Sequence, residues 1–144
     1  MMKQCTFDHT RVRICLDALD VENLSGRLYN MTLSDPISFH DLGKMVIDAD
    51  KLFDEIGSPQ SFQERRTFGS ASKKHTYQFH PKERMKPEDF YAQSGAVLTF
   101  DFVVETRQYT GLQGRVYNAE NIEIGQFTNE TELLRIILEL IEKN

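Results

Sequence analysis

The sequence predicts an α+β fold: a two-layer sandwich in which a four-stranded antiparallel sheet carries two helices on one face. Two observations predict it. The stretch LSGRLYN at 24–30 returns as LQGRVYN at 112–118. In each copy this stretch follows a segment of alternating polar and apolar residues, which is typical of a half-buried strand, and precedes an apolar stripe at helical spacing. We therefore predict a duplicated β-β-α unit within a single domain spanning 1–144.

The repeat extends beyond these seven residues. One ungapped shift of 88 positions aligns about 45 residues, and it places Phe39 on Phe127. A single register over this length indicates an internal duplication. Exchange of strands between two chains, which would make a homodimer rather than a monomer, is the alternative interpretation. The predicted parts are a first unit at 11–56, a basic connector at 57–97 and a second unit at 98–144.

Each element of the first unit has its own signal. Alternation in RVRICLD, at 11–17, predicts the first strand, and LSGRLYNM predicts the second. After a turn at SDP, Ser38 is expected to open a helix, with Asp41 completing a capping box. Gly57 is expected to end this helix in a left-handed conformation. The apolar stripe between them comprises Leu42, Met45, Val46, Ala49, Leu52, Phe53 and Ile56.

The second unit repeats these signals. LTFDFVVET, at 98–106, alternates and pairs with LQGRVYN in the predicted sheet. Asn129 and Glu132 offer a capping box for the second helix. That helix carries its apolar stripe on Leu133, Leu134, Ile137, Leu140 and Ile141.

Composition narrows the class of protein. Apolar residues make up 40% of the chain and include ten Phe, so a folded core is expected. The net charge of −5 argues against free nucleic acid as the partner of the whole surface. Cys5 and Cys15 are expected to be free thiols of a cytoplasmic protein that does not interact with membranes, because the chain shows neither a membrane-spanning apolar run nor a signal peptide.

The repeated stretch places polar side chains on one face of the sheet. If its leucines face the helices, Arg27, Tyr29, Arg115 and Tyr117 point to the opposite face. One hypothesis is that this face is a docking platform, because Arg and Tyr are enriched at binding hot spots. The structural alternative is that Asp17 and Glu105 pair with the arginines of their own hairpins, contributing about 0.2–1 kcal/mol each. The glycines of the repeat, Gly26 and Gly114, would let a helix or a bulky Phe approach the backbone closely.

The connector differs in charge from the rest of the chain. Residues 57–86 carry seven basic and two acidic side chains, a net charge of +5, which leaves −10 elsewhere. This segment is either a solvated crossover or a basic arm that contacts phosphate or an acidic partner. The candidate contact residues in the arm are Arg65, Arg66, Lys73 and Lys74.

Chemistry-bearing motifs are sparse. The four histidines form no spaced Cys/His set of the kind that zinc requires, so we predict no metal, no cofactor and no catalytic residue. The alternative is a metal site or a general acid–base site formed by His75 and His80 near Glu83. Cys15 has no visible base beside it, which argues against a nucleophile.

The segments ICLDAL, LSGRLYN and ISFHDLGKMVIDADKLFDEIGSPQ, with their second-unit counterparts, resemble small duplicated proteins of Firmicutes that occur on plasmids and other mobile elements. In those relatives Trp often stands where this chain has Leu112 and Tyr117. More distantly, the chain resembles small acidic proteins from the same mobile elements that are anti-CRISPR inhibitors of type II effector nucleases. The resemblance implies a non-catalytic, acidic protein that blocks a CRISPR nuclease or its ribonucleoprotein. The alternative is a protein that binds RNA, or cleaves guide RNA, through the basic connector.

Overall fold

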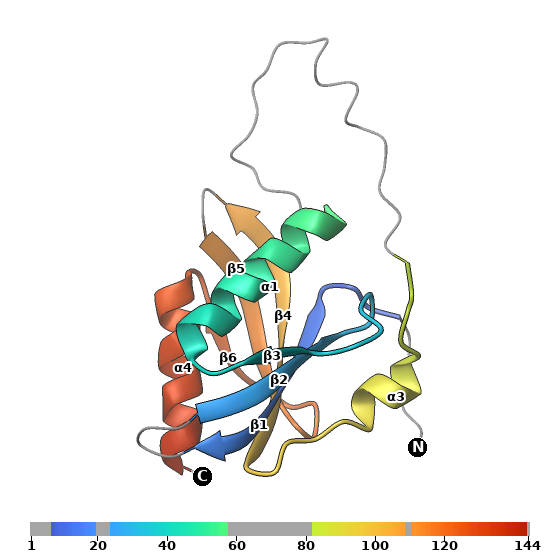
Figure 1. Ribbon diagram of the computed structural model, residues 1–144. Coiled ribbons are helices and arrows are strands. Elements are labelled where there is room, and N and C mark those ends of the chain that lie inside the picture. The colour runs from blue at the N-terminus through green and yellow to red at the C-terminus, as the bar shows by residue number, and fades with distance from the viewer. Residues whose placement is uncertain (1–6, 20–23, 58–81, 109–110, 144) are drawn as a thin grey trace.

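The computed structural model describes residues 7–19, 24–57, 82–108 and 111–143. They form one six-stranded antiparallel sheet with three helices (Figure 1). The strands follow the order β3-β2-β1-β4-β5-β6, so that β1 and β4 are the central pair. The element bounds are β1 Arg11–Leu19, β2 Leu24–Asn30, β3 Ile37–Phe39, α1 Leu42–Ile56, α3 Pro87–Tyr91, β4 Leu98–Gln108, β5 Gly111–Asn118, β6 Glu123–Phe127 and α4 Glu130–Lys143.

The predicted four-stranded sheet built from β-β-α units with two helices is therefore wrong. Each half of the chain contributes a third short strand, β3 or β6, which pairs with the outer side of β2 or β5. The shift of 88 reaches these strands as well, since Gly26 pairs with Phe39 and Gly114 with Phe127. A third helix, α3, lies within the part of the chain predicted to be a connector.

The first helix begins later than predicted. Ser38 belongs to β3, where it pairs with Arg27, because the strand ladder satisfies its backbone. The N-cap of α1 is Asp41, whose side chain accepts a hydrogen bond from Lys44 N at 2.7 Å. The end of the helix is as predicted: Gly57 has φ 83° and donates its N–H to Phe53 O.

The second helix starts with a variant of the predicted capping box. Asn129 Oδ1 accepts from Glu132 N at 2.9 Å, as expected for an N-cap. The Glu132 carboxylate, however, reaches Thr128, whose N and Oγ1 both donate to Glu132 Oε1, at 2.8 and 2.9 Å. These bonds hold the pKa of Glu132 below its ordinary value.

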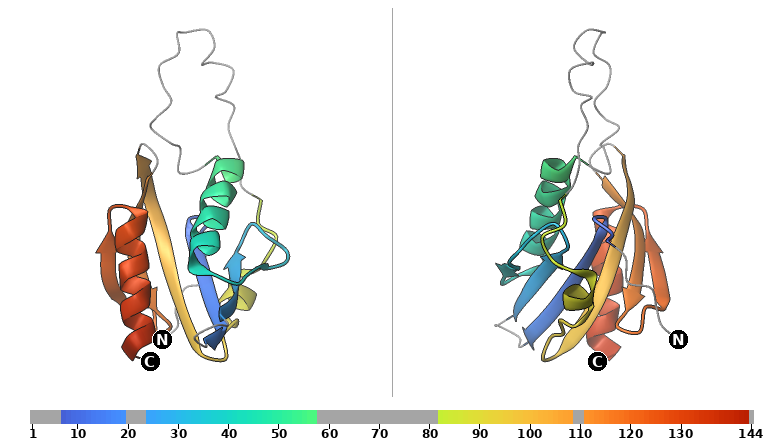
Figure 2. Two further views of the ribbon diagram at one scale, coloured as in Figure 1. Left: turned by 60° about the vertical axis from the view of Figure 1, so that its left-hand side comes forward. Right: turned by 90° about the vertical axis from the view of Figure 1, so that its right-hand side faces the viewer.

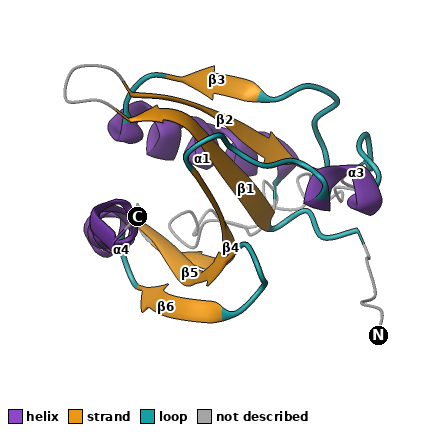
Figure 3. Cartoon of the chain, turned by 90° about the horizontal axis from the view of Figure 1, so that it is seen from below, coloured by secondary structure: helices purple, strands orange, loops and turns teal. Residues whose placement is uncertain are grey.

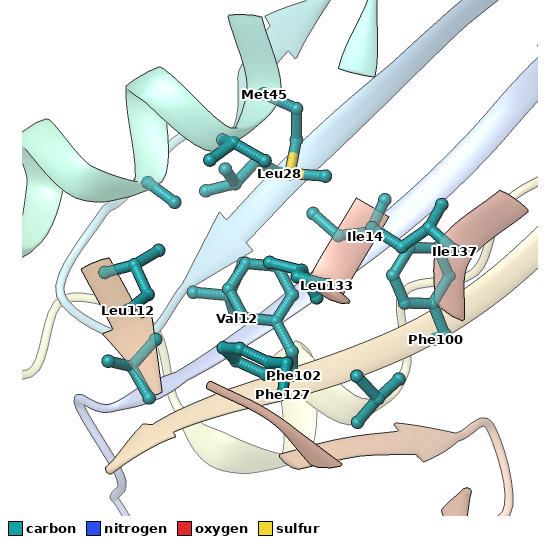
Figure 4. Packing of buried hydrophobic residues seen from close by; sticks show 14 of the residues in the cluster. Val12, Ile14, Leu28, Met45, Phe100, Phe102, Leu112, Phe127, Leu133 and Ile137 are labelled. Atoms are coloured by element: carbon teal, nitrogen blue, oxygen red, sulfur yellow. The ribbon is translucent and has the colours of Figure 1, made fainter. Parts of the chain in front are cut away.

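The main core lies between the sheet and the two long helices. Seen from below, the sheet curves around α1 and α4, while α3 lies against its other side (Figure 3). Phe102 and Phe127 pack edge to face, with ring centroids 6.2 Å apart, among aliphatic side chains from both halves (Figure 4). A smaller cluster on the other side of the sheet contains Cys15, Tyr29, Met31 and Phe90. The side of the sheet predicted to be free is thus partly covered.

The glycines of the repeated stretch are close-packing points, as predicted. The Phe39 ring lies over Gly26, where an added Cβ would lie 2.6 Å from Phe39 Cζ. At Gly114 an added Cβ would lie 1.8 Å from the Val103 carbonyl oxygen and 3.1 Å from Phe127 Cζ. Neither position has room for a side chain.

Among the described residues, none of the helices has the length and apolar character needed to cross a membrane.

Candidate functional site

The side of the sheet opposite α1 and α4, which we call the polar face, carries charged side chains at its centre. Arg11 and Arg13 on β1 both bind Asp101 on β4, with Nε–Oδ distances of 2.8 and 2.7 Å. All three side chains are buried. Arg11 also donates to the side chain of Asn121 and lies over the Tyr117 ring, 4.8 Å from its centroid. One carboxylate therefore serves two guanidinium groups, and aromatic rings cover the excess positive charge.

A chain segment runs across the polar face of the first half. We call residues 82–97 the strap; it contains α3, and Figure 2 shows it passing along the side of the sheet away from α1. Its start is tied to the end of β2, since Arg84 N and Met85 N both donate to Met31 O. After α3, Arg13 Nη1 donates to Tyr91 O at 3.0 Å and to Gln93 O at 3.1 Å. The strap is thus bound by side chains of the face that it covers.

Arg27 and Tyr29, two of the predicted platform residues, belong to this covered part. Arg27 forms a two-point pair with Asp17, at 2.8 and 3.0 Å, and donates to the hydroxyl of Tyr29 at 2.7 Å. Its Nη2 also donates to Ser94 O in the strap at 2.9 Å. Tyr29 itself is buried. Arg27, followed by the Ala96 N–H, holds the pKa of Asp17 below its usual value. The predicted pairing of Asp17 with Arg27 is confirmed.

Arg115 and Tyr117 lie on β5, on the other half of the polar face, where Tyr117 and Tyr91 of the strap both lie beside the Arg11 guanidinium group. The Arg115 side chain is 39% exposed, and its Nη1 donates to Glu123 Oε1 at 3.0 Å. Its Nε lies 3.0 Å from Glu105 Oε2, which confirms the predicted ion pair, although the N–H is not aligned for a hydrogen bond. The sheet therefore does not gather the four platform residues into one open patch, because β1 and β4 lie between the two pairs and the strap covers the part that holds Arg27 and Tyr29. Their role in binding a partner stays a prediction.

The basic arm is described in part. Arg65, Arg66, Lys73 and Lys74 lie outside the described residues, as do His75 and His80. The described end of the connector, in the strap, exposes Lys82, Arg84 and Lys86.

Reactive groups of the described residues are few and separated. Cys15 is a free thiol, fully buried in the cluster with Phe90, and burial raises its pKa to about 11. A thiol with that pKa is protonated at neutral pH and is a poor nucleophile. Burial also lowers the pKa of His9. In the part of the chain that the structure describes, no group of three or more His, Cys, Asp or Glu side chains could hold a metal ion.

The edge strand β6 presents a feature that the sequence reasoning missed. Ile122, which directly precedes β6, is 59% exposed, and Ile124 within the strand is 38% exposed, although large aliphatic side chains are usually buried. Glu120 and Glu123 flank them and are also exposed. The alternation in NIEIGQF was the available signal, but it is short and lies directly before a helix cap.

Carboxylates gather on the same half of the protein. Residues 118–143, which cover the β5–β6 turn, β6 and α4, carry six carboxylates and two cationic side chains. Most of these carboxylates are exposed. By contrast, the arginines of the polar face are paired with carboxylates across the sheet. The charge available to a partner on this half is therefore negative.

Comparison of the chain with models of protein families, with curated proteins and with solved structures found no match.

Proposed function

We propose that this chain is a non-catalytic binding protein that recognises a basic surface of a protein partner through the acidic half formed by residues 118–143. The observation that supports it is the separation of charge. The arginines of the sheet are held by carboxylates of the sheet, and Arg115 uses Glu123 of β6 for this purpose. The remaining carboxylates of residues 118–143 are mostly exposed, and the segment holds only two cationic side chains. Such an arrangement steers a positively charged partner and repels free nucleic acid.

The partner class follows from the resemblance of the sequence to small proteins of mobile elements. On that basis we propose a type II CRISPR nuclease, or its ribonucleoprotein, as the protein that this chain blocks. Acidic side chains would occupy a channel that is built to hold phosphate groups. The cytoplasm is the proposed compartment, where Cys15 would remain a reduced thiol.

A dose–response experiment tests the proposal. The purified protein is incubated with a type II nuclease, guide RNA and labelled target DNA, and both nucleic acids are then resolved on a denaturing gel. We expect target cleavage to stop at a near-stoichiometric ratio while the guide RNA stays intact. Unchanged cleavage at a large excess of the protein would contradict the proposed partner.

The second candidate function is action on RNA through the basic connector. The observation that favours it is the exposure of Lys82, Arg84 and Lys86 at the described end of the connector. The same gel distinguishes the two functions, because shortened guide RNA that accumulates with repeated turnover would indicate a ribonuclease. Intact RNA in a gel-shift complex with the protein alone would indicate RNA binding.

A further inference from the structure

The two edges of the sheet are protected to different extents. Edge strands expose unpaired backbone N–H and C=O groups, and proteins usually shield them with proline, lysine, bulges or short length. On one edge, β3 has three residues and follows Pro36 directly. On the other edge, β6 has five residues and contains neither proline nor lysine. Its one irregularity is a bulge, in which Ile124 is the extra residue opposite β5.

The β6 edge, which has a bulge but neither proline nor lysine, also carries apolar side chains. Ile122 and Ile124 are two of the most exposed large hydrophobic residues among those described. The helix side of β6 is already occupied, because Ile136 of α4 packs over Gly125, where an added Cβ would lie 2.9 Å from Ile136 Cδ1. A ligand that covers the isoleucines must therefore approach along the free edge or from the polar face.

Charge selects the class of ligand. Glu120 is exposed just before Ile122, whereas Glu123, between the two isoleucines, is paired with Arg115. The surrounding segment 118–143 carries six carboxylates and two cationic side chains. A second copy of this chain would bring the same carboxylates together at the joint, and like charges facing each other across strands are destabilising. A strand with basic side chains would instead form cross-strand ion pairs with them while its backbone completes the ladder.

We propose that the free edge of β6 is a docking site for a basic, extended segment of a protein partner, which adds to the sheet as a seventh strand. The backbone of that segment binds the edge, its apolar side chains cover Ile122 and Ile124, and its cations meet Glu120 and the other exposed carboxylates of residues 118–143. This inference rests on the proposed function and names the surface through which the acidic half engages its basic partner.

Synthetic peptides test the edge directly. Three eight-residue probes are compared: one alternating Val with Lys, one alternating Val with Glu, and the Lys peptide with alternate backbone nitrogens methylated. Binding is followed by the amide resonances of the ¹⁵N-labelled full chain. We expect the Lys peptide to shift and protect amides of residues 123–127, and the other two to bind at least about fivefold more weakly. Equal binding of the methylated peptide, or shifts spread over α4 without β6, would overturn the proposal.

Variants provide the matched test. Ile122→Lys should weaken binding of the Lys peptide by at least about fivefold. Ile47→Lys is the control, because Ile47 on α1 is exposed to almost the same extent, 57% against 59% for Ile122, and lies outside the β6 edge. If Ile122→Lys lowers the unfolding midpoint, Ile122→Ser replaces it. Equal losses in the Ile122 and Ile47 variants would overturn the proposal.

Two further measurements separate the edge from the proposed function. We expect sedimentation of the unmodified chain to show no dimer that forms through the β6 edge. A dimer that the Ile124→Lys substitution dissociates would mean that a second copy occupies the edge. In the nuclease assay, Ile122→Lys should lose inhibition and Ile47→Lys should keep it. Full inhibition by both variants would overturn the edge proposal and leave the binding function standing. Absence of inhibition by the unmodified chain would contradict the proposed function, while the peptide result still decides the edge.

Discussion

Arg13 and Asp101 face each other across the two central strands and form a buried two-point ion pair, with Nε–Oδ1 and Nη2–Oδ2 distances of 2.7 and 3.2 Å. The shift of 88 that relates the two repeated stretches carries position 13 onto position 101. The pair therefore lies where the two halves of the sheet meet. Because Arg11 binds the same carboxylate, one buried anion balances only one of two buried cations, and the Tyr91 and Tyr117 rings lie beside the remaining positive charge.

Removal of this anion should be strongly destabilising. Asp101→Asn keeps the shape of the side chain but leaves two guanidinium groups buried beside a neutral amide, so we expect the free energy of unfolding to fall by about 3–5 kcal/mol. Urea unfolding at pH 7 measures the loss. Glu105→Gln, on the same strand but exposed, is the control and should cost less than about 1 kcal/mol. A similarly small loss for Asp101→Asn would show that the two arginines do not depend on the carboxylate.

Asp17 should make the free energy of unfolding depend on pH. Arg27 holds the pKa of Asp17 in the folded state below its ordinary value of 3.8, so folding favours the ionised carboxylate. The resulting stabilisation is fully present above pH 3.8 and is lost as the pH falls through the folded-state pKa. We expect Asp17→Asn to be less stable than the native chain by at most about 1 kcal/mol at pH 7, because the pair is partly exposed. Unfolding curves at several pH values should show the two proteins converging in acid; a constant difference would contradict this assignment.

Side chains introduced at the repeated glycines should disrupt the sheet. Gly114→Val places a branched side chain against the Val103 carbonyl, and Gly26→Val places one against the Phe39 ring and the Cys15 carbonyl. We expect each to lower the free energy of unfolding by about 1–3 kcal/mol or more, with Gly114→Val the worse because its closest obstacle is backbone. Thermal unfolding provides the measurement.

Gly43→Ala is the control for the glycine variants. Its added Cβ would meet only Asp41 Oδ1, the N-cap acceptor of α1, at 3.3 Å. Displacing this cap costs about 1 kcal/mol at most, and the higher helix propensity of Ala offsets about the same amount, so we expect a small net change. Similar losses at positions 43 and 114 would argue against close packing as the cause.

The strap should control access to Cys15. Phe90 and Cys15 are both fully buried in the same cluster, so Phe90→Ala removes the side chain that closes it. In a Cys5→Ser background, we expect the variant to react with a thiol reagent at neutral pH about tenfold faster or more, through local opening of the strap. The native chain in the same background is the reference, and its thiol is protected both by burial and by a pKa of about 11. Equal labelling rates would mean that the strap does not shield the thiol.

The two arginines of the repeated stretch should differ in their structural roles. Arg115→Ala removes partly exposed ion pairs and should cost less than about 1 kcal/mol. Arg27→Ala also removes the hydrogen bonds to the Tyr29 hydroxyl and to Ser94 O, so it should cost more and speed labelling of Cys15. Urea unfolding measures both. The inhibition assay then tests the platform hypothesis: a folded Arg115→Ala that inhibits fully would exclude Arg115 from the binding surface.

Local patterns in the sequence determined the long elements of this protein. Alternation placed β1, β2, β4 and β5, and the apolar stripes placed α1 and α4, because each pattern extends over several turns or strand residues. The spacing of Gly26 and Gly114 indicated close packing, and the charges of Asp17 and Glu105 indicated the hairpin pairs. Each of these inferences requires only neighbours along the chain or across one hairpin.

Tertiary structure decided the features that join distant segments. The edge strands β3 and β6 are too short to show a period, and they form because β2 and β5 offer unpaired edges. The strap covers the polar face because Arg13, Arg27 and Met31 supply hydrogen-bond partners to it. Arg27 and Ser94 are 67 residues apart in the sequence, and no local pattern encodes such a contact. Arg13 and Asp101 become buried for the same reason: their pairing depends on β1 lying beside β4, and that contact exists only in the folded chain.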